Sequence, residues 1–124
     1  MNNYIAIALG GAIGACLRYA INEWSLQLLG RSFPFGTLLV NMLGAFIIGL
    51  LYGLITTEQI AATPWRVFIG IGLLGALTTF STFSLDTFLL LQQGAMVKAV
   101  SNVFLNVLVC LTLTWLGIKL GSMK

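Results

Sequence analysis

The sequence predicts an all-α membrane protein with four transmembrane helices per chain, and three observations lead to this fold class. Of the 124 residues, 59% are hydrophobic and only 7% are charged, whereas soluble domains carry roughly 25% charged residues. That much apolar surface would cover a soluble protein of this length with exposed hydrophobic patches. The apolar residues also form four long runs, and each run reaches the ~20 residues that a bilayer-spanning helix needs.

The short polar, proline or glycine-containing stretches between the runs set the expected boundaries. The spans are predicted at residues 4–29, 36–56, 65–91 and 97–120. Residues 1–124 therefore form a single transmembrane domain, and we expect no catalytic residue and no enzyme activity. The first run is too long for the apolar core of a signal peptide and is expected to stay in the mature chain. The net charge of +3 is spread over ends and loops, which is typical of bilayer anchoring and not of nucleic-acid binding.

The third span is predicted to break near its middle, between Gly75 and Thr79. Its length corresponds to about 40 Å of helix, against a hydrocarbon core of about 30 Å. Six of the ten residues from Gly75 to Ser84 are Gly, Ser or Thr, which weaken a helix or compete for its backbone hydrogen bonds. Irregular backbone at this depth needs surrounding protein or a water-filled cavity, as at ion-binding sites. A continuous helix with a packing face of small residues is the alternative.

Polar side chains recur inside three of the four spans, where each must find a partner or a pathway. Small residues suited to close helix packing accompany them, at Gly10, Gly14, Ala45, Gly49 and Gly53. The polar residues are Thr37 and Asn41 in the second span, Thr79, Ser81, Thr82, Ser84 and Thr87 in the third, and Asn102, Asn106, Cys110 and Thr114, spaced by four, in the fourth. Such residues serve either as hydrogen-bonding contacts between helices or as the lining of a polar track.

The chemistry of these residues favours passive movement of an anion. Amides and hydroxyls are neutral donors, whereas a cation path usually carries rings of Asp or Glu. Arg18 is the one cation well inside a span and either extends to the interface or attracts anions to a vestibule. Phe80 and Phe83 would share a helix face, and the edge of an aromatic ring is electropositive. No His is present, and the three acidic residues lie toward span ends or in a loop, which argues against proton-coupled transport.

The distribution of positive charge suggests how more than one chain could assemble. Four short helices leave little space inside one chain, so an aqueous path needs an oligomer. With spans crossing in turn, both sides of the membrane receive equal charge: Arg66, Lys119 and Lys124 on one, Arg18, Arg31 and Lys98 on the other. This balance leaves no positive-inside bias. Insertion in both directions, and hence an antiparallel two-fold dimer, is therefore permitted.

Three blocks of sequence resemble the Fluc (CrcB-type) fluoride channels and occur in the order found in that family. They are GGAIGACLRY at residues 10–19, FGTLLVNMLG at 35–44 and GALTTFSTFS at 75–84. The resemblance implies a dual-topology antiparallel homodimer with two pores, each lined by both subunits. It also implies passive, selective export of fluoride across the cytoplasmic (inner) membrane of a microbial cell, which relieves fluoride toxicity.

The resemblance also implies roles for individual residues. Phe80 and Phe83 would be the pore aromatics, Asn41 a fluoride-contacting amide and Arg18 part of a vestibule. Backbone carbonyls of Gly75 and Thr78 from both subunits would hold one structural Na⁺ at the dimer interface. The remaining expected pore-lining residues are Thr37, Ser81, Thr82 and, where the family often has a hydroxyl, Asn106.

Two other functions remain open from the sequence. A small multidrug-type, proton-coupled exporter would also be a four-span, dual-topology protein. It needs a membrane-embedded carboxylate near the middle of the first span, whereas Glu23 lies near that span's end. A non-conducting assembly subunit would explain the packing glycines and leave the polar stripes unexplained.

Overall fold

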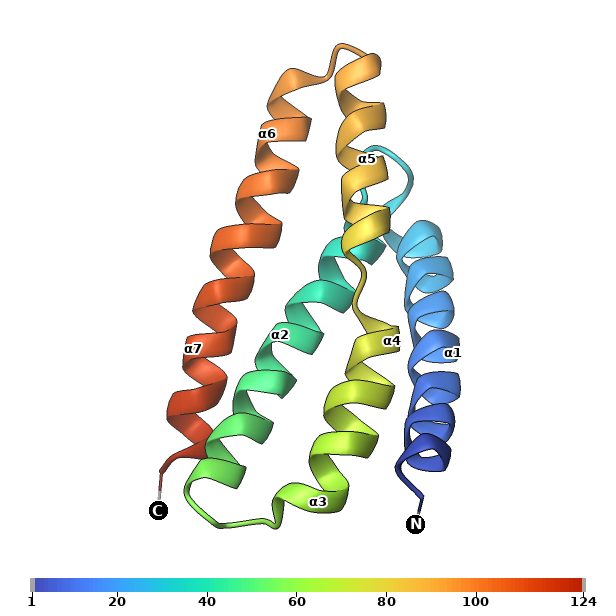
Figure 1. The fold of residues 1–124 in the computed structure, drawn as a ribbon. Coiled ribbons are helices and arrows are strands. Elements are labelled where there is room, and N and C mark those ends of the chain that lie inside the picture. The colour runs from blue at the N-terminus through green and yellow to red at the C-terminus, as the bar shows by residue number, and fades with distance from the viewer. Residues whose placement is uncertain (1, 124) are drawn as a thin grey trace.

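The computed structural model describes residues 2–123 as a bundle of helices with both ends of the chain on the same side (Figure 1). The helices are α1 (Asn3–Leu29), α2 (Phe35–Thr56), α3 (Ala62–Trp65), η1 (Arg66–Leu74), α4 (Gly75–Leu77), α5 (Phe80–Gln92), α6 (Met96–Phe104), η2 (Leu105–Val109) and α7 (Cys110–Gly121). In η1 and η2 the backbone has π-helical hydrogen bonding. Lys124, one of the charges counted above, lies outside the described residues.

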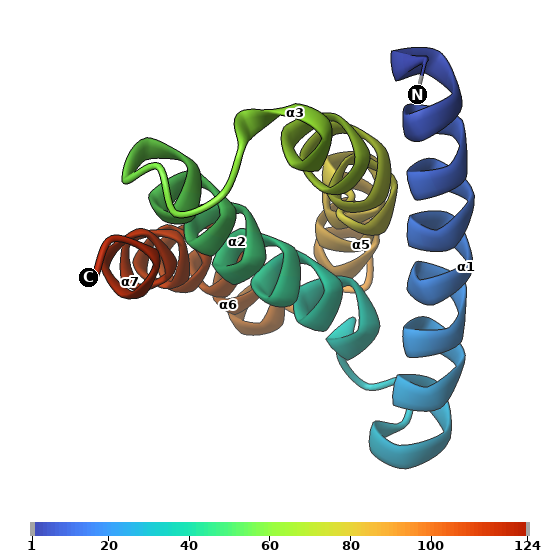
Figure 2. The same ribbon diagram turned by 90° about the horizontal axis from the view of Figure 1, so that it is seen from below.

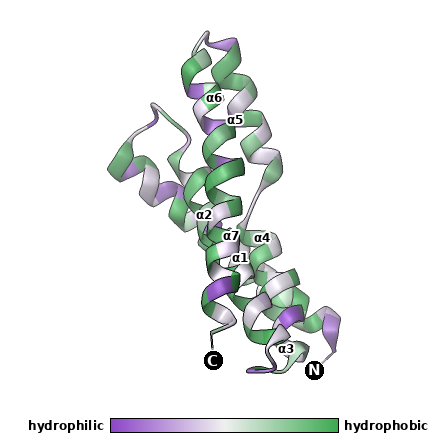
Figure 3. Cartoon of the chain, turned by 90° about the vertical axis from the view of Figure 1, so that its left-hand side faces the viewer, coloured by the Kyte–Doolittle hydropathy of each residue, from purple (hydrophilic) through white to green (hydrophobic). Residues whose placement is uncertain are grey.

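These helices make four segments that are long and apolar enough to cross a membrane: Asn3–Leu29, Phe35–Thr56, Ala62–Gln92 and Met96–Gly121. The four-span prediction is confirmed, with boundaries within three residues of those expected. Apolar residues cover most of the helix surfaces, and many of the polar ones lie near helix ends and loops (Figure 3). Many large hydrophobic side chains are therefore exposed, such as Tyr4 and Val97, because lipid takes the place that water has around a soluble protein.

Local sequence explains where the first two spans begin and end. The Asn2 side chain accepts a hydrogen bond of 3.0 Å from the Tyr4 N–H and so caps α1. Gly30, with φ of 76°, ends α1, because a residue with a Cβ is strained in that conformation. Pro34 directly precedes α2, where its missing N–H costs no helical hydrogen bond.

Glycines decide which helices pack together. Gly10 and Gly14 of α1 lie against the backbone of η1, where a Cβ would collide with main-chain atoms. Gly49 and Gly53 of α2 meet the backbone of α7 in the same way. The close approaches predicted from these glycines are thus confirmed, and at these points the helices meet through backbone contact.

The inclination of the helices leaves the bundle open. In the view from below, α1 is seen lengthwise while α7 is seen nearly along its axis, so α1 is steeply inclined to the rest (Figure 2). The buried core is correspondingly small and centres on Val40, Leu74 and Leu77. This core lies where α2 passes the middle of the third span, and it supports the site described next.

Candidate functional site

The third span is interrupted at Thr78 and Thr79, whose backbones are extended (φ −78°, ψ 157° and φ −151°, ψ 116°). The interruption falls at the C-terminal end of the predicted stretch, and Gly75 itself remains helical. Both threonines hold the two helix ends in place. The Thr78 hydroxyl donates to the Leu74 carbonyl over 2.8 Å, and the Thr79 hydroxyl accepts from the Thr82 N–H over 3.1 Å, which is an N-cap of α5.

Asn41 of α2 replaces the backbone partners that Thr79 loses at the break. The Thr79 N–H donates to Asn41 Oδ1 over 2.8 Å, and Asn41 Nδ2 donates to the Thr79 carbonyl over 3.1 Å. The side-chain amide thus satisfies the main chain as a neighbouring peptide group would. Thr79 is only 6% exposed, so these hydrogen bonds are what makes irregular backbone tolerable at this depth.

The same amide continues into a chain of hydrogen bonds that crosses three spans. Asn41 Nδ2 also donates to Asn106 Oδ1 over 2.9 Å, and Asn106 Nδ2 donates to the carbonyl and to Oδ1 of Asn102, each over 3.0 Å. Asn102 Nδ2 donates to the Thr87 hydroxyl over 3.0 Å, and that hydroxyl donates to the Phe83 carbonyl over 2.8 Å. This series of hydrogen bonds therefore starts and ends on the third span, at Thr79 and at Phe83.

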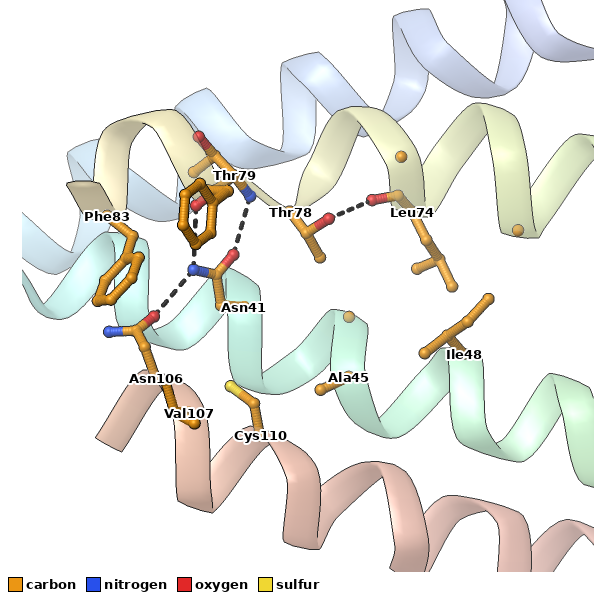
Figure 4. A pocket seen from close by; sticks show the side chains of 14 residues that line it. Asn41, Ala45, Ile48, Leu74, Thr78, Thr79, Phe83, Asn106, Val107 and Cys110 are labelled. Carbon is orange, nitrogen blue, oxygen red and sulfur yellow. Dashed lines mark hydrogen bonds between the residues drawn. The ribbon is translucent and has the colours of Figure 1, made fainter. Parts of the chain in front are cut away.

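An open cavity of about 410 Å³ lies beside the break, between α2, the two halves of the third span and the middle of the fourth (Figure 4). Amides gather at one end of it and apolar groups at the other. Its lining is Asn41, Gly44, Ala45, Ile48, Gly70, Leu74, Gly75, Thr78, Thr79, Phe80, Phe83, Asn106, Val107 and Cys110.

Two aromatic rings border the amide end of this cavity. Phe80 and Phe83 were predicted to share a helix face, and in the structure their rings meet edge to face, with centroids 5.5 Å apart. Phe83 is 9% exposed, whereas Phe80 is 78% exposed. A ring edge carries partial positive charge, so the two rings form a weakly electropositive border of the cavity. On the side of Phe80, no other part of the described chain covers this border.

The break also brings two helix ends with opposite partial charge to the cavity. The carbonyl end of α4 is partially negative, and the amide end of α5 is partially positive. In a continuous helix the Thr79 and Thr82 N–H groups would donate to the carbonyls of Gly75 and Thr78. Here they donate to Asn41 Oδ1 and Thr79 Oγ1, so those two carbonyls lose their helical partners.

A second polar cluster lies one helical turn away on α2. Thr37 donates to Asp86 Oδ2 over 2.8 Å, and both residues, with Thr82 and the buried Ser25, line a separate cavity of about 240 Å³. Sequence reasoning missed this pair, because Asp86 lies toward the end of its span, where an acidic side chain can reach the membrane surface. The signal that could have found it is an ionisable side chain within a membrane segment, which needs a partner.

The predicted pore residues are thus only partly brought together. Four of them line the open cavity, namely Asn41, Asn106, Phe80 and Phe83, together with the expected Na⁺ residues Gly75 and Thr78. Ser81 and Thr82 gather around the Thr79 hydroxyl, at 3.3 Å and 3.0 Å. Thr37 belongs to the second cavity, and Arg18 lies half-buried on α1, outside the lining of both.

Comparison with known proteins places this arrangement in a family. Residues 5–118 match the model of the family described as CrcB-like protein, Camphor Resistance (CrcB). The chain is 58% identical over 118 residues to the fluoride-specific ion channel FluC of Pseudoalteromonas translucida, covering 95% of this chain and 98% of the relative. It is 58% identical over 120 residues to the FluC of Shewanella amazonensis, covering 97% and 96%. The FluC of Vibrio campbellii is 57% identical over 114 residues, covering 92% and 90%.

Proposed function

The chain belongs to the CrcB-like family, and on that premise we propose that it is a fluoride-specific ion channel that lets fluoride leave the cell passively across the cytoplasmic membrane. Relatives at 57–58% identity over nearly the full chain carry the name fluoride-specific ion channel. The observation that carries the proposal is the chemistry of the open cavity, where neutral amides and aromatic edges meet beside a broken helix. Function at this site is binding and conduction, and no enzyme chemistry is assigned to it.

The neutrality of the lining suits a small anion that must pass through. Fluoride is strongly hydrated, so close donors must replace its water. Asn41 supplies an amide donor, with Asn106 hydrogen-bonded beside it, and Phe80 and Phe83 supply ring edges. A fixed positive charge at this depth would hold the anion too tightly for rapid exit, since conduction needs binding that is also easily reversed.

A proton-coupled drug exporter finds no support in this arrangement. Such a carrier needs a titratable group at its substrate site. Among the described residues, the lining of the open cavity contains no acidic side chain, and Glu23 is exposed near the end of α1. The relatives reported above are named as channels.

We propose that the conducting unit is an antiparallel homodimer with two pores. One chain supplies only part of the wall around the cavity, and Phe80, a bordering residue, is 78% exposed. A second copy related by a two-fold axis would cover this side and close the path. The equal numbers of positive charges expected on the two membrane faces support insertion in both directions.

The break suits a structural Na⁺ on the two-fold axis of this proposed dimer. The carbonyls of Gly75 and Thr78 are released from helical hydrogen bonding by the contacts of Asn41 and Thr79. Both residues line the open cavity, and Gly75 is exposed. Carbonyl oxygens at the negative end of a half-helix suit a hard monovalent cation. Two carbonyls from each subunit would hold the ion, which would join the subunits.

Anion efflux from liposomes tests the proposed function. Vesicles loaded with KF and KCl are diluted into impermeant salt, fluoride and chloride electrodes record release, and a K⁺ ionophore balances charge. Release of fluoride that depends on the ionophore, without release of chloride, is the expected result. If folded protein released neither ion, or released both at similar rates, the assignment as a fluoride-specific channel would be wrong.

A further inference from the structure

We propose that Asn102 is a positioning residue for conduction, because it holds Asn106 in the orientation that presents an oxygen, and not an N–H, to Asn41. Asn102 does not line the open cavity and is 0% exposed. Its influence on the cavity runs through the hydrogen bonds of its side chain. The proposal deepens the proposed channel function and rests on it.

The direction of the hydrogen-bond chain is set by groups that have only one role. At one end the Thr79 N–H can only donate, and it donates to Asn41 Oδ1. At the other end the Phe83 carbonyl can only accept, and it accepts from the Thr87 hydroxyl. That hydroxyl, having donated its one hydrogen, must accept from Asn102 Nδ2. Each side-chain amide between the two ends therefore has only one orientation in which its oxygen accepts and its nitrogen donates along the series.

Asn102 fixes the orientation of Asn106, the amide of the fourth span that lines the cavity. Since Asn102 Nδ2 is directed at Thr87, its Oδ1 faces Asn106 and accepts from Asn106 Nδ2 over 3.0 Å. The second N–H of Asn106 goes to the Asn102 carbonyl, also over 3.0 Å. Both donors of Asn106 are thereby occupied, and only its oxygen is left for Asn41.

The consequence for an anion follows from counting the donors of Asn41. One N–H of Asn41 goes to the Thr79 carbonyl and the other to Asn106 Oδ1, so fluoride gains the second donor only by displacing the Asn106 oxygen. An oxygen that competes with the ion keeps binding weak, which suits rapid release. If Asn106 turned, its N–H groups would face the ion beside that of Asn41. Two amides converging on fluoride would hold it longer and slow conduction.

Two substitutions test this role at separate links of the chain. Asn102→Leu keeps a buried side chain of similar size but removes the side-chain acceptor of one Asn106 N–H, which leaves only the backbone carbonyl of residue 102 as a partner. Thr87→Val removes the acceptor that orients Asn102. In each variant we expect the maximal rate of fluoride efflux to fall about tenfold and the half-saturating fluoride concentration to fall as well, since a tighter site empties more slowly.

The controls separate positioning from folding. Thr87→Ser keeps the hydroxyl and should conduct at the wild-type rate. Thr112→Val is matched to Thr87→Val, because Thr112 also donates to the carbonyl four residues before it, over 2.8 Å, but lies exposed on α7. It should leave efflux unchanged. The double variant Asn102→Leu/Thr87→Val should be no slower than either single variant, because coupled residues are not additive.

Each outcome has a definite meaning. Wild-type efflux from both Asn102→Leu and Thr87→Val would overturn the positioning role, as would losses that multiply in the double variant. A fall in efflux matched by loss of thermal stability, with an unchanged half-saturating concentration, would make Asn102 merely structural and would also overturn the proposal. If the wild-type chain itself released no fluoride, the proposed channel function would fail, which is a different and distinguishable result.

Discussion

Replacing Asn41 with Asp changes one atom group at the centre of the site, and its effect follows from the geometry. The acceptor for the Thr79 N–H, at 2.8 Å, is retained. The amide nitrogen becomes an oxygen that faces two other acceptors, the Thr79 carbonyl at 3.1 Å and Asn106 Oδ1 at 2.9 Å. Two hydrogen bonds are therefore lost, and a negative charge enters a cavity lined by neutral side chains.

The magnitude for conduction comes mainly from the charge. A unit negative charge about 4 Å from an anion costs about 4 kcal/mol at an effective dielectric constant of about 20. A barrier raised by that amount slows passage by roughly a thousandfold. The two lost hydrogen bonds, at about 0.6 kcal/mol each for polar contacts between membrane helices, are small by comparison. We therefore expect Asn41→Asp to lose fluoride flux while remaining folded.

Fluoride efflux from liposomes, combined with the melting temperature of the purified protein, checks this expectation. Gln92→Glu is the matched control, because it makes the same amide-to-carboxylate change at an exposed position at the end of α5. That control should conduct like the wild type. Efflux from Asn41→Asp within about twofold of wild type would refute the reasoning, because a barrier raised by a few kcal/mol slows passage by far more than twofold.

Three further predictions address the aromatic border, the cation and the packing. Phe80→Ile removes a ring edge and should lower fluoride efflux from liposomes by at least about tenfold, with an unchanged elution volume in gel filtration; undiminished flux would remove Phe80 from the path. Exchange of Na⁺ for a large organic cation should abolish efflux, and added Na⁺ but not added K⁺ should restore it; flux independent of the cation would exclude a Na⁺ requirement. Gly49→Val places side-chain atoms against the α7 backbone at Thr114 and should lower unfolding stability by about 1–3 kcal/mol or more, seen in the melting temperature. A wild-type melting temperature would show that the spacing of α2 and α7 can widen to fit the valine without loss of stability.

The fold was largely predictable because the hydropathy of a segment and its glycine content determine its structure without reference to distant residues. Each span is a run of apolar residues longer than the bilayer core requires, so its existence does not depend on neighbouring spans. The break was also predictable, since Gly75 and the following threonines weaken the helix wherever they are placed. Its position at Thr78 and Thr79 was less so, because it depends on which backbone groups find partners on α2.

The site was predictable in its residue types and not in its pairings. Polar stripes on three spans indicated that amides and hydroxyls meet, and Asn41 and Asn106 do so. Arg18 and Thr37, expected in the same pore, lie outside the lining of the open cavity. Asp86 gained a partner in Thr37 that spacing along the chain could not reveal, because the two residues are 49 positions apart.

The amino-acid sequence by itself determined that the chain spans a membrane four times, that its third span is weak near the middle, and that neutral donors and aromatic rings are available there. Only the tertiary structure decided that Asn41 repairs the break and that Asn102 faces Thr87. The physical reason is that burial in lipid acts on each residue separately, whereas a hydrogen bond between residues 38 or 65 positions apart depends on how helices cross and on which face each presents.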